Sequence, residues 1–462
     1  VKGNVTRYAY DRADNLVRLE EPDGNVHRFE YDAMGNMVHA SDNIREVRFT
    51  YGALGILKSR EQERHHITFG YNSELQLRRI GNEAGDNYFF ELDGLGLVVT
   101  ETGFDGLRRE YERDGAGRVT RVNRPGGKWT EYQYDGLDNI LKEEQYDGEV
   151  SLYTYDKDGM LVKAKNSENL LEFTRDRKTG LVTEERQGEY TVSRTYDGEG
   201  NCTRITSSLG ADIRHTYDRE GNLQTMQAGE GWQASWVRDN TGLEVQRTFS
   251  GGVTVCTERD GFGREVRKSV RSGGIERGAY RYEWGIAGRL LSKENELTGT
   301  VMRYDYDRFD FLIRQEPTQG SATDVMSRVP AFVGNLFGTP DRKDRKYGAG
   351  GKLLEDPDCF YHYDDEGNLI FREFKQLQET GVRYDRKRME KERGIRCLAT
   401  GTGWLYEWAS NGMLKKVIRP DGRPVEFRYD ALGRRTAKQY FGKATRWVWD
   451  GNVPLHEWSY KA

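Results

Sequence analysis

Residues 16–36 read LVRLEEPDGNVHRFEYDAMGN, and this stretch decides the fold. Residues 16–19 and 27–31 have the length and the β-prone side chains of strands, with Phe29 and Tyr31 on one face. Between them, residues 22–25 (Pro-Asp-Gly-Asn) have the composition of a tight turn. After Tyr31, Asp32 can accept from N–H groups of its own turn, and Gly35 can take a positive φ. The stretch predicts a β-hairpin with a turn at each end.

The pattern Tyr-Asp-x-x-Gly-Asn-Leu recurs along most of the chain. Its first two positions fall, 20 or 21 residues apart, at Tyr10-Asp11, Tyr31-Asp32, Tyr51-Gly52, Tyr71-Asn72, Leu92-Asp93, Arg113-Asp114, Tyr134-Asp135, Tyr155-Asp156, Arg175-Asp176, Tyr196-Asp197, Tyr217-Asp218, Arg238-Asp239 and Arg259-Asp260. Thirteen consecutive units therefore share one register. Where another residue replaces the tyrosine, we expect the row of tyrosines to weaken and the fold to persist.

Beyond Arg259 the period loosens. Further units begin at Trp284-Gly285, Tyr306-Asp307, Tyr347-Gly348, Tyr363-Asp364, Trp408-Ala409, Tyr429-Asp430 and Trp449-Asp450. Residues 313–346, with Pro317, Pro330 and Pro340, interrupt the pattern and are poorly suited to a regular ladder. We predict a regular array over 1–312, an insert over 313–346 and a second, incomplete array over 347–462.

The repeat predicts an all-β protein of tandem antiparallel β-hairpins in one continuous sheet. Its recurring residues are interpreted as turn chemistry and not as a catalytic site. They are Tyr10, Asp11, Tyr31, Asp32, Gly35, Tyr134, Asp135, Tyr155, Asp156, Gly159, Tyr196, Asp197, Gly200, Tyr217, Asp218, Gly221, Tyr363, Asp364, Gly367, Tyr429, Asp430 and Gly433. No catalytic, cofactor-binding or metal-binding residue is predicted.

Composition excludes several classes of function. The 71 Lys and Arg nearly balance the 75 Asp and Glu, so no strong positive field favours nucleic acid. No apolar run has the length of a membrane span. The four cysteines lie far apart and form no metal-binding pair, so reduced thiols are expected. Phosphate-loop, nucleophile-elbow and zinc-protease motifs do not occur.

Three further features have plain structural interpretations. Residues 376–393 predict one short helix whose basic residues form a solvated face, because acidic residues interleave them. His65 and His66 are neighbours on a predicted strand and point to opposite faces, so we expect exposed histidines and not a metal site. Paired acids such as Glu143-Glu144 are frequent, so none is singled out as a catalytic pair.

The repeat resembles the Rhs/YD-repeat family, whose Tyr-Asp-x-x-Gly-Asn/Arg-Leu unit is seen at residues 31–37, 217–223 and 363–369. Residues 425–435 and 445–451 look like the last part of the core of bacterial Rhs proteins. The resemblance implies a continuous sheet that spirals into a hollow shell or cocoon around a C-terminal toxin domain. It implies delivery by type VI secretion or Tc-type complexes, and a role in interbacterial competition.

From this resemblance we expect the chain's own C-terminal toxin domain as its cargo, with secretion-spike or chaperone proteins as further partners. The protein would be made in the bacterial cytoplasm and then secreted or delivered. The family's self-cleaving segment is not found before Ala462, so no cleavage residues are assigned and no enzymatic activity is expected. The 313–346 insert would pack on the outer wall or fold inward as a plug or cargo contact.

An estimate of size limits what this segment encloses alone. About eighteen hairpins give roughly 4,000 Å² of sheet, which closes to a lumen of about 13 Å radius, whereas a toxin of around 130 residues needs about 18 Å. We therefore expect flanking residues to complete the shell. The alternatives are a cell-surface adhesion or carbohydrate-binding module that uses exposed Tyr and Trp, and an enzyme with an acidic pair in a groove.

Overall fold

The computed structural model describes residues 4–63, 65–318, 325–331, 333–378 and 381–461. They form two compact units, each built from two stretches that are far apart in the sequence. Unit 1 contains Val1–Asn87 and Arg214–Asp344, and unit 2 contains Tyr88–Ile213 and Arg345–Ala462.

Unit 1 consists of β-hairpins. Its first stretch contains β1 (Arg7–Tyr10), β2 (Leu16–Glu20), β3 (Val26–Tyr31), β4 (Met37–Ser41), β5 (Glu46–Tyr51), β6 (Leu57–Gln62), β7 (His65–Tyr71) and β8 (Leu77–Gly81). Its second contains β22 (Leu223–Ala228), β23 (Trp232–Arg238), β24 (Glu244–Phe249), β25 (Val253–Arg259), β26 (Glu265–Ser272), β27 (Ile275–Trp284), β28 (Leu290–Asn295), β29 (Thr300–Tyr306), β30 (Leu312–Pro317), β31 (Met326–Ser327), β32 (Val329–Pro330) and β33 (Leu336–Phe337).

Unit 2 has the same construction. Its first stretch contains β10 (Val98–Thr102), β11 (Arg108–Arg113), β12 (Val119–Arg124), β13 (Lys128–Tyr134), β14 (Ile140–Gln145), β15 (Val150–Tyr155), β16 (Leu161–Lys165), β17 (Leu170–Arg175), β18 (Val182–Gln187), β19 (Tyr190–Tyr196) and β20 (Cys202–Ser207), while β9 (Asn87–Leu92) and β21 (Asp212–Tyr217) cross the unit boundaries. Its second contains β34 (Lys346–Tyr347), β35 (Leu353–Glu355), β36 (Cys359–Tyr363), β37 (Leu369–Phe374), α1 (Arg386–Arg393), β38 (Gly403–Trp408), β39 (Leu414–Ile418), β40 (Pro424–Tyr429), β41 (Arg435–Tyr440), β42 (Lys443–Asp450) and β43 (Val453–Lys461).

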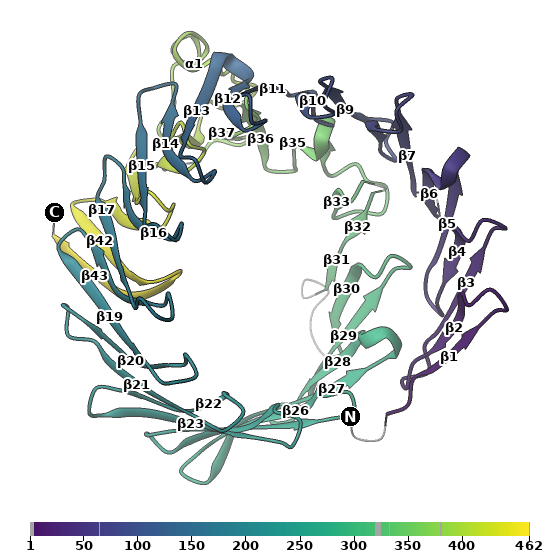
Figure 1. The fold of residues 1–462 in the computed structure, drawn as a ribbon, viewed down its shortest axis with the longest axis vertical. Helices are drawn as coiled ribbons and strands as arrows, with labels where there is room; N and C mark the ends of the chain where they lie inside the picture. The colour runs from purple at the N-terminus through teal and green to yellow at the C-terminus, as the bar shows by residue number, and fades with distance from the viewer. Residues whose placement is uncertain (1–3, 64, 319–324, 332, 379–380, 462) are drawn as a thin grey trace. The chain divides into compact units, whose positions relative to one another are not determined.

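Strands that follow one another in the sequence pair antiparallel, as β2 does with β3 and β3 with β4 (Figure 1). The strands numbered β1 through β31 form one hydrogen-bonded sheet of 31 strands, and those numbered β34 through β43 form a ten-stranded sheet. The predicted all-β ladder of tandem antiparallel hairpins is therefore confirmed.

Each hairpin has two kinds of turn, one at each edge of the sheet. We call the turn that follows the Tyr-Asp position the YD turn, and the other the return turn. In the YD turn after β3, Asp32 Oδ1 accepts from the N–H groups of Met34 and Asn36, both at 2.9 Å. Gly35 has φ 83° there, and the register shifts between Glu30 and Tyr31. The aspartate thus accepts from turn N–H groups that have no backbone acceptor within the tight turn.

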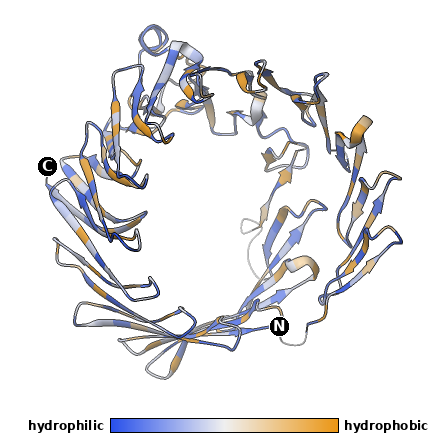
Figure 2. Ribbon diagram, viewed as in Figure 1, coloured by the Kyte–Doolittle hydropathy of each residue, from blue (hydrophilic) through white to orange (hydrophobic). Residues whose placement is uncertain are grey.

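The apolar core is thin. Figure 2 shows hydrophilic residues along nearly every strand, with hydrophobic positions between them. Buried apolar clusters occur where chain segments stack: one joins Phe371, Met389, Ile395 and Leu405, and another joins Val192, Ile205 and Val448. Because single hairpin faces bury little apolar surface, the fold depends on backbone ladders, turns and contacts between stretches.

Two local predictions have definite outcomes. The helix forms over Arg386–Arg393 only, where Asp385 accepts from the Arg388 N–H at 2.8 Å and Gly394 ends the helix at φ 66°. The prediction that both histidines are exposed is wrong for His65. Its ring lies 4.1 Å from that of Phe309, because the return turn after β6 packs against the YD turn after β29.

In the predicted insert, β30 carries the ladder to Pro317 and pairs with β31 through Arg314–Ser327 and Gln315–Met326. β32 and β33 form a separate pair. Residues 319–324 and 332 lie outside the described residues. The division into array, insert and second array stays a prediction.

Candidate functional site: the seam of unit 2

Within unit 2, the YD turns of residues 345–462 lie against the return turns of residues 88–213, and we call this contact the seam. Figure 1 shows β42 and β43 beside β17 and β19. Successive return turns meet successive YD turns, because both rows recur with the hairpin period. The contacts run from Lys352–Asp105 through Lys128–Glu366, Arg124–Ser410, Tyr153–Ala431, Asn166–Tyr429 and Gln187–Trp449 to Ser207–His456.

Glu185 on β18 is the centre of the seam. Its carboxylate is buried and accepts from Arg434 Nη1 at 2.6 Å, from Gln187 Nε2 at 3.0 Å and from Arg194 Nη2 at 3.3 Å. Arg434 comes from the YD turn after β40 and also binds Asp430 Oδ2 at 2.8 Å. A buried carboxylate is stable only with such partners, so removing one member of the cluster would leave the remaining buried charges without full compensation.

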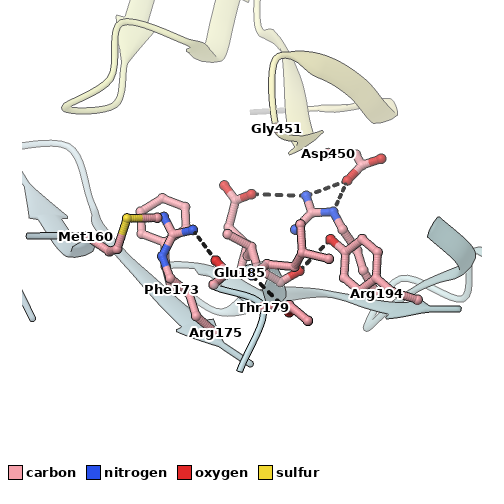
Figure 3. Close-up of a pocket in the computed structure, with 12 residues that line it drawn as sticks. Met160, Phe173, Arg175, Thr179, Glu185, Arg194, Asp450 and Gly451 are labelled. Atoms are coloured by element: carbon pink, nitrogen blue, oxygen red, sulfur yellow. Dashed lines mark hydrogen bonds and ion pairs between the residues drawn. The ribbon is translucent and has the colours of Figure 1, made fainter. Parts of the chain in front are cut away.

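Arg194 on β19 forms the second bridge across the seam. Its guanidinium binds both Glu185 and Asp450, the last residue of β42 (Figure 3). Burial by itself lowers the pKa of Arg194, but the charges and hydrogen bonds of Asp450 and Glu185 outweigh burial and raise it. Arg194 therefore stays charged at every physiological pH.

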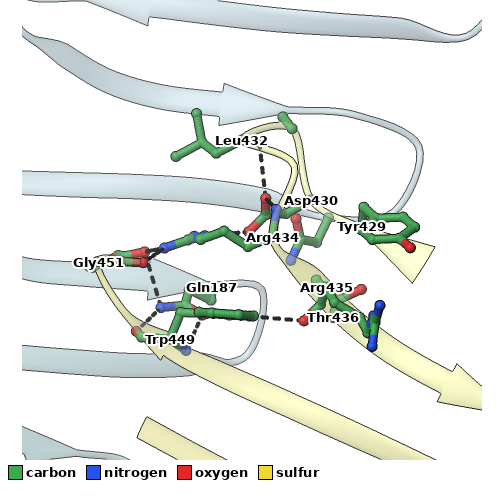
Figure 4. Close-up of polar contacts among 12 residues, drawn as sticks. Gln187, Tyr429, Asp430, Leu432, Arg434, Arg435, Thr436, Trp449 and Gly451 are labelled. Atoms are coloured by element: carbon green, nitrogen blue, oxygen red, sulfur yellow. Dashed lines mark hydrogen bonds and ion pairs between the residues drawn. The ribbon is translucent and has the colours of Figure 1, made fainter. Parts of the chain in front are cut away.

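Gln187 joins the backbone of the other stretch. Its Oε1 accepts from Trp449 N–H at 3.0 Å, and its Nε2 donates to Trp449 O at 2.5 Å (Figure 4). The side-chain amide thus pairs with both backbone groups of Trp449, as a residue of a neighbouring strand would. Two directional bonds at one residue fix the register of β42 against β18.

Arg434 shares two contacts with Arg118, its equivalent in an earlier YD turn, and adds one that crosses the seam. Arg118 occupies the same turn position, binds its turn aspartate Asp114 at 2.8 Å and donates to the next YD turn at Asp135 O, also at 2.8 Å. Arg434 makes both kinds of bond, the second to Gly451 O at 2.8 Å, and adds Glu185. The seam therefore adds one contact to an arginine hydrogen-bonding pattern that the YD turn of Arg118 also has.

A cavity of about 640 Å³ lies beside the bridge (Figure 3). Met160, Phe173 and Tyr196 line its apolar part, and Glu185, Arg194 and Asp450 line its polar part. These charged groups already bind one another. The cavity is therefore a space along the seam and not an array of free catalytic groups.

Unit 1 contains a seam of the same kind between its own two stretches. The Ala287 N–H donates to Asp23 Oδ2 at 2.9 Å, and Arg45 lies 3.9 Å from Asp310. Arg308 pairs with Glu63 at 2.8 Å. Return turns of the first stretch again meet YD turns of the second.

The predicted repeat residues all lie at YD turns. Two of these turns contact the return turns of residues 88–213 at the seam. Tyr429 and Asp430 belong to one of them, and the turn of Asp364 and Gly367 makes its contact through Glu366. In the first stretches the same turn aspartates bind mainly within their own turns, as Asp135 and Asp197 do. Glu185, Gln187 and Arg194 were not predicted, because they stand on strands at positions whose partner lies 249 to 262 residues away.

The residue before the turn aspartate has a role that the repeat pattern concealed. Tyr31 OH donates to Leu16 O at 3.0 Å, and Trp284 Nε1 donates to Glu265 O at 2.8 Å. Arg113 Nη2 donates to Val98 O at 3.0 Å. Each acceptor begins the strand after the previous YD turn. Arginine and tryptophan thus replace the tyrosine hydroxyl as donor and keep neighbouring hairpins linked.

Among the described residues, no helix is both long and apolar enough to span a membrane. In the same part of the chain, no three or more His, Cys, Asp or Glu side chains gather as ligands for a metal ion.

Comparison with known proteins agrees with the repeat. Residues 10–43, 196–231 and 410–445 match the family described as RHS Repeat. Probable deoxyribonuclease RhsB of Dickeya dadantii (strain 3937) is 29% identical over 226 residues, 46% of this chain and 14% of that protein. Double-stranded DNA deaminase toxin A of Burkholderia cenocepacia (strain H111) is 28% identical over 244 residues, 47% of this chain and 15% of that protein. The chain thus spans a small part of these relatives.

Solved structures share the fold over essentially the whole chain. The Tc holotoxin pore of Photorhabdus luminescens superposes with a TM-score of 0.69 at 14% identity, covering 100% of this chain and 27% of that one. The crystal structure of TcdB2-TccC3 gives 0.67 at 14% identity, with 99% and 28% covered. The matched repeats, the relatives and the common fold lead to one conclusion: the chain carries RHS repeats and is similar to proteins of the Rhs/YD-repeat family.

Proposed function

We propose that the chain is a wall segment of a Rhs-type shell that encloses a toxin domain of the same polypeptide. The observation that carries the proposal is the seam. In each unit, hairpins far apart in sequence are joined turn to turn by ion pairs and backbone contacts, so the ladder is sealed against itself. A sealed wall suits containment, because its function is steric.

The relatives support a toxin as the cargo. They are named as a deoxyribonuclease and a DNA deaminase toxin, and this chain covers only 14% or 15% of their length. We propose a non-enzymatic role for this segment, and we place the activity in a C-terminal cargo domain. Synthesis in the bacterial cytoplasm, delivery by type VI secretion with spike or chaperone partners, and interbacterial competition belong to the same proposal.

Limited proteolysis of the longer polypeptide, with the domain that follows this segment, tests containment. We expect that domain to resist protease in the wild type. Glu185→Ala should expose it, because Arg434 and Arg194 lose their shared partner across the seam.

Glu143→Ala is the matched control. Glu143 occupies the equivalent strand position and accepts from Gln145 at 2.7 Å, as Glu185 does from Gln187, but among the described residues it has no ion pair with residues 345–462. A domain cleaved equally fast in the wild type and in isolation would refute containment.

A further inference from the structure

Arg435 begins β41 at a place that apolar residues fill in most other hairpins. It follows the YD turn of Asp430 and corresponds to the leucine of the Tyr-Asp-x-x-Gly-Asn-Leu unit. Leucine fills the same place at Leu16, Leu57, Leu77, Leu161, Leu223, Leu290, Leu312, Leu353, Leu369 and Leu414. Two other units carry a charge there, at Glu244 and Glu265. Arg435 is therefore a cation at a position where the repeat favours an apolar side chain.

The two acidic exceptions have cationic partners, whereas Arg435 has no anionic one. Glu244 accepts from Arg247 at 2.7 Å, and Glu265 lies 3.4 Å from Lys268. Within the part of the chain that the structure describes, Arg435 forms no ion pair, and its Nε is buried without a hydrogen-bond acceptor. A buried donor without an acceptor costs free energy. The guanidinium can therefore take an acceptor that the described residues do not supply.

Three aromatic rings lie around the Arg435 guanidinium. Its central carbon is 4.7 Å from the centre of the Phe427 ring, 6.0 Å from that of Tyr429 and 5.9 Å from that of Trp447. Figure 4 shows the side chain pointing away from Arg434. Rings that stack on a guanidinium leave the N–H groups at its edge for an acceptor in the same plane. The rings thus orient the guanidinium without neutralising its charge.

A pocket of about 470 Å³ lies against Arg435. Its apolar walls are aromatic and aliphatic side chains, namely Tyr429, Leu432, Trp447 and Trp449. Arg434 also lines the pocket, but Asp430 and Glu185 already bind its guanidinium. Among the described residues, no carboxylate lines the pocket. One unmatched positive charge therefore faces a largely apolar space.

Other YD turns show which acceptor suits an arginine that lies over an aromatic ring. Arg118 is 4.9 Å from the centre of the Tyr134 ring and binds the carboxylate of Asp114. Arg264 also lies over an aromatic ring and binds Asp260. Arg435 has the rings without the carboxylate. The acceptor that completes this arrangement is a carboxylate from outside the described residues.

We propose that the Arg435 pocket binds a monocarboxylate that carries an apolar group next to its carboxylate. One unmatched guanidinium balances one negative charge, and its edge donors can bind both oxygens of a planar carboxylate. The apolar walls give up water against the neighbouring group of the ligand. The carboxylate belongs either to a free small molecule or to the longer polypeptide. The site does not depend on the containment of a toxin.

Calorimetric titration with phenylacetate tests the site, and phenylacetamide serves as the uncharged counterpart. We expect the wild type to bind phenylacetate saturably and at least tenfold more tightly than phenylacetamide at the same ionic strength. Arg435→Leu should lose this preference and retain its unfolding temperature, because leucine fills the same place in ten other hairpins. A wild type that binds the two probes equally, or a variant that binds phenylacetate as the wild type does, would overturn the proposal.

A matched variant separates the pocket from net charge. Lys415→Leu removes the same charge from an exposed position directly after Leu414, the equivalent of Arg435 in the preceding hairpin. Its affinity for phenylacetate should equal that of the wild type. A loss as large as that of Arg435→Leu would assign the binding to overall charge and overturn the site.

The longer polypeptide identifies the source of the carboxylate. If it binds phenylacetate as tightly as this chain does, the pocket is open in the longer polypeptide and the ligand is a free small molecule. If it does not bind the probe, while this chain binds it through Arg435, a carboxylate of the longer polypeptide fills the pocket. Either result supports the site, because both require binding that Arg435→Leu abolishes.

Discussion

At the scale of single residues, the position before the turn aspartate is filled in most hairpins by a side chain that can donate a hydrogen bond, aromatic or not, and Leu92 is an exception. Arg175, Arg238 and Arg259 donate to Leu161 O, Leu223 O and Glu244 O, where tyrosines in other hairpins use their hydroxyl groups. The expectation that the fold persists at these replacements thus has a physical reason. A donor must span the gap to the preceding YD turn, and arginine, tyrosine and tryptophan are all long enough.

Arg113 allows a direct test of this rule. Arg113→Leu should destabilise the fold by about 1–2 kcal/mol, because Val98 O and Gly117 O lose their donor. Arg113→Tyr should retain most of the stability by restoring the bond to Val98 O. Urea denaturation of both variants measures the difference, and equal losses would show that the donor is dispensable.

Glu373 makes local stability depend on pH. Burial by itself raises the pKa of Glu373, but hydrogen bonds from His362 and from the N–H groups of Leu398, Gly401 and Ala399 outweigh it and lower the pKa to about 2. Because the folded pKa lies below the unfolded value of about 4.3, the stabilisation is complete above that value and is lost as pH falls toward 2.

We therefore expect the protection of residues 396–402 from hydrogen exchange, measured against the intrinsic rate at each pH, to fall between about pH 4 and pH 2 in the wild type. In the Glu373→Gln variant, residues 396–402 should be poorly protected already at neutral pH, and this pH dependence should disappear. The glutamine side chain has one acceptor oxygen in place of the two carboxylate oxygens that Leu398, Ala399 and Gly401 use. A pH profile unchanged by the substitution would assign the effect to other groups.

At the scale of elements, the seam depends on the match between two rows of turns. Glu185→Ala should destabilise unit 2 by about 3 kcal/mol, because two buried guanidinium groups lose a charged partner. Glu143→Ala should have a smaller effect, since Glu143 bridges no seam pair and burial already raises its pKa. Thermal unfolding of the two variants gives the comparison, and equal losses would place the cost in β-strand packing.

At the scale of the whole molecule, each unit has its own seam, so damage should stay local. Arg434→Ala should raise hydrogen exchange in β18, β19 and β42 and leave the Asp23–Ala287 contact of unit 1 protected. Arg118→Ala removes the same turn bonds without crossing a seam and should affect only its own hairpin. Exchange that spreads equally through both units would show one cooperative structure.

The sequence by itself determined the hairpin ladder, the YD turns and the resemblance to Rhs/YD repeats, because these depend on residues within one period of each other. Asp32 and Gly35 specify a turn wherever the chain lies. Only the tertiary structure decided which turns meet. Gln187 and Trp449, or Asp23 and Ala287, are more than 260 residues apart, and their contact follows from how the whole ladder returns on itself within a unit. Local chemistry cannot encode that offset, since every turn of a repeat offers nearly the same groups.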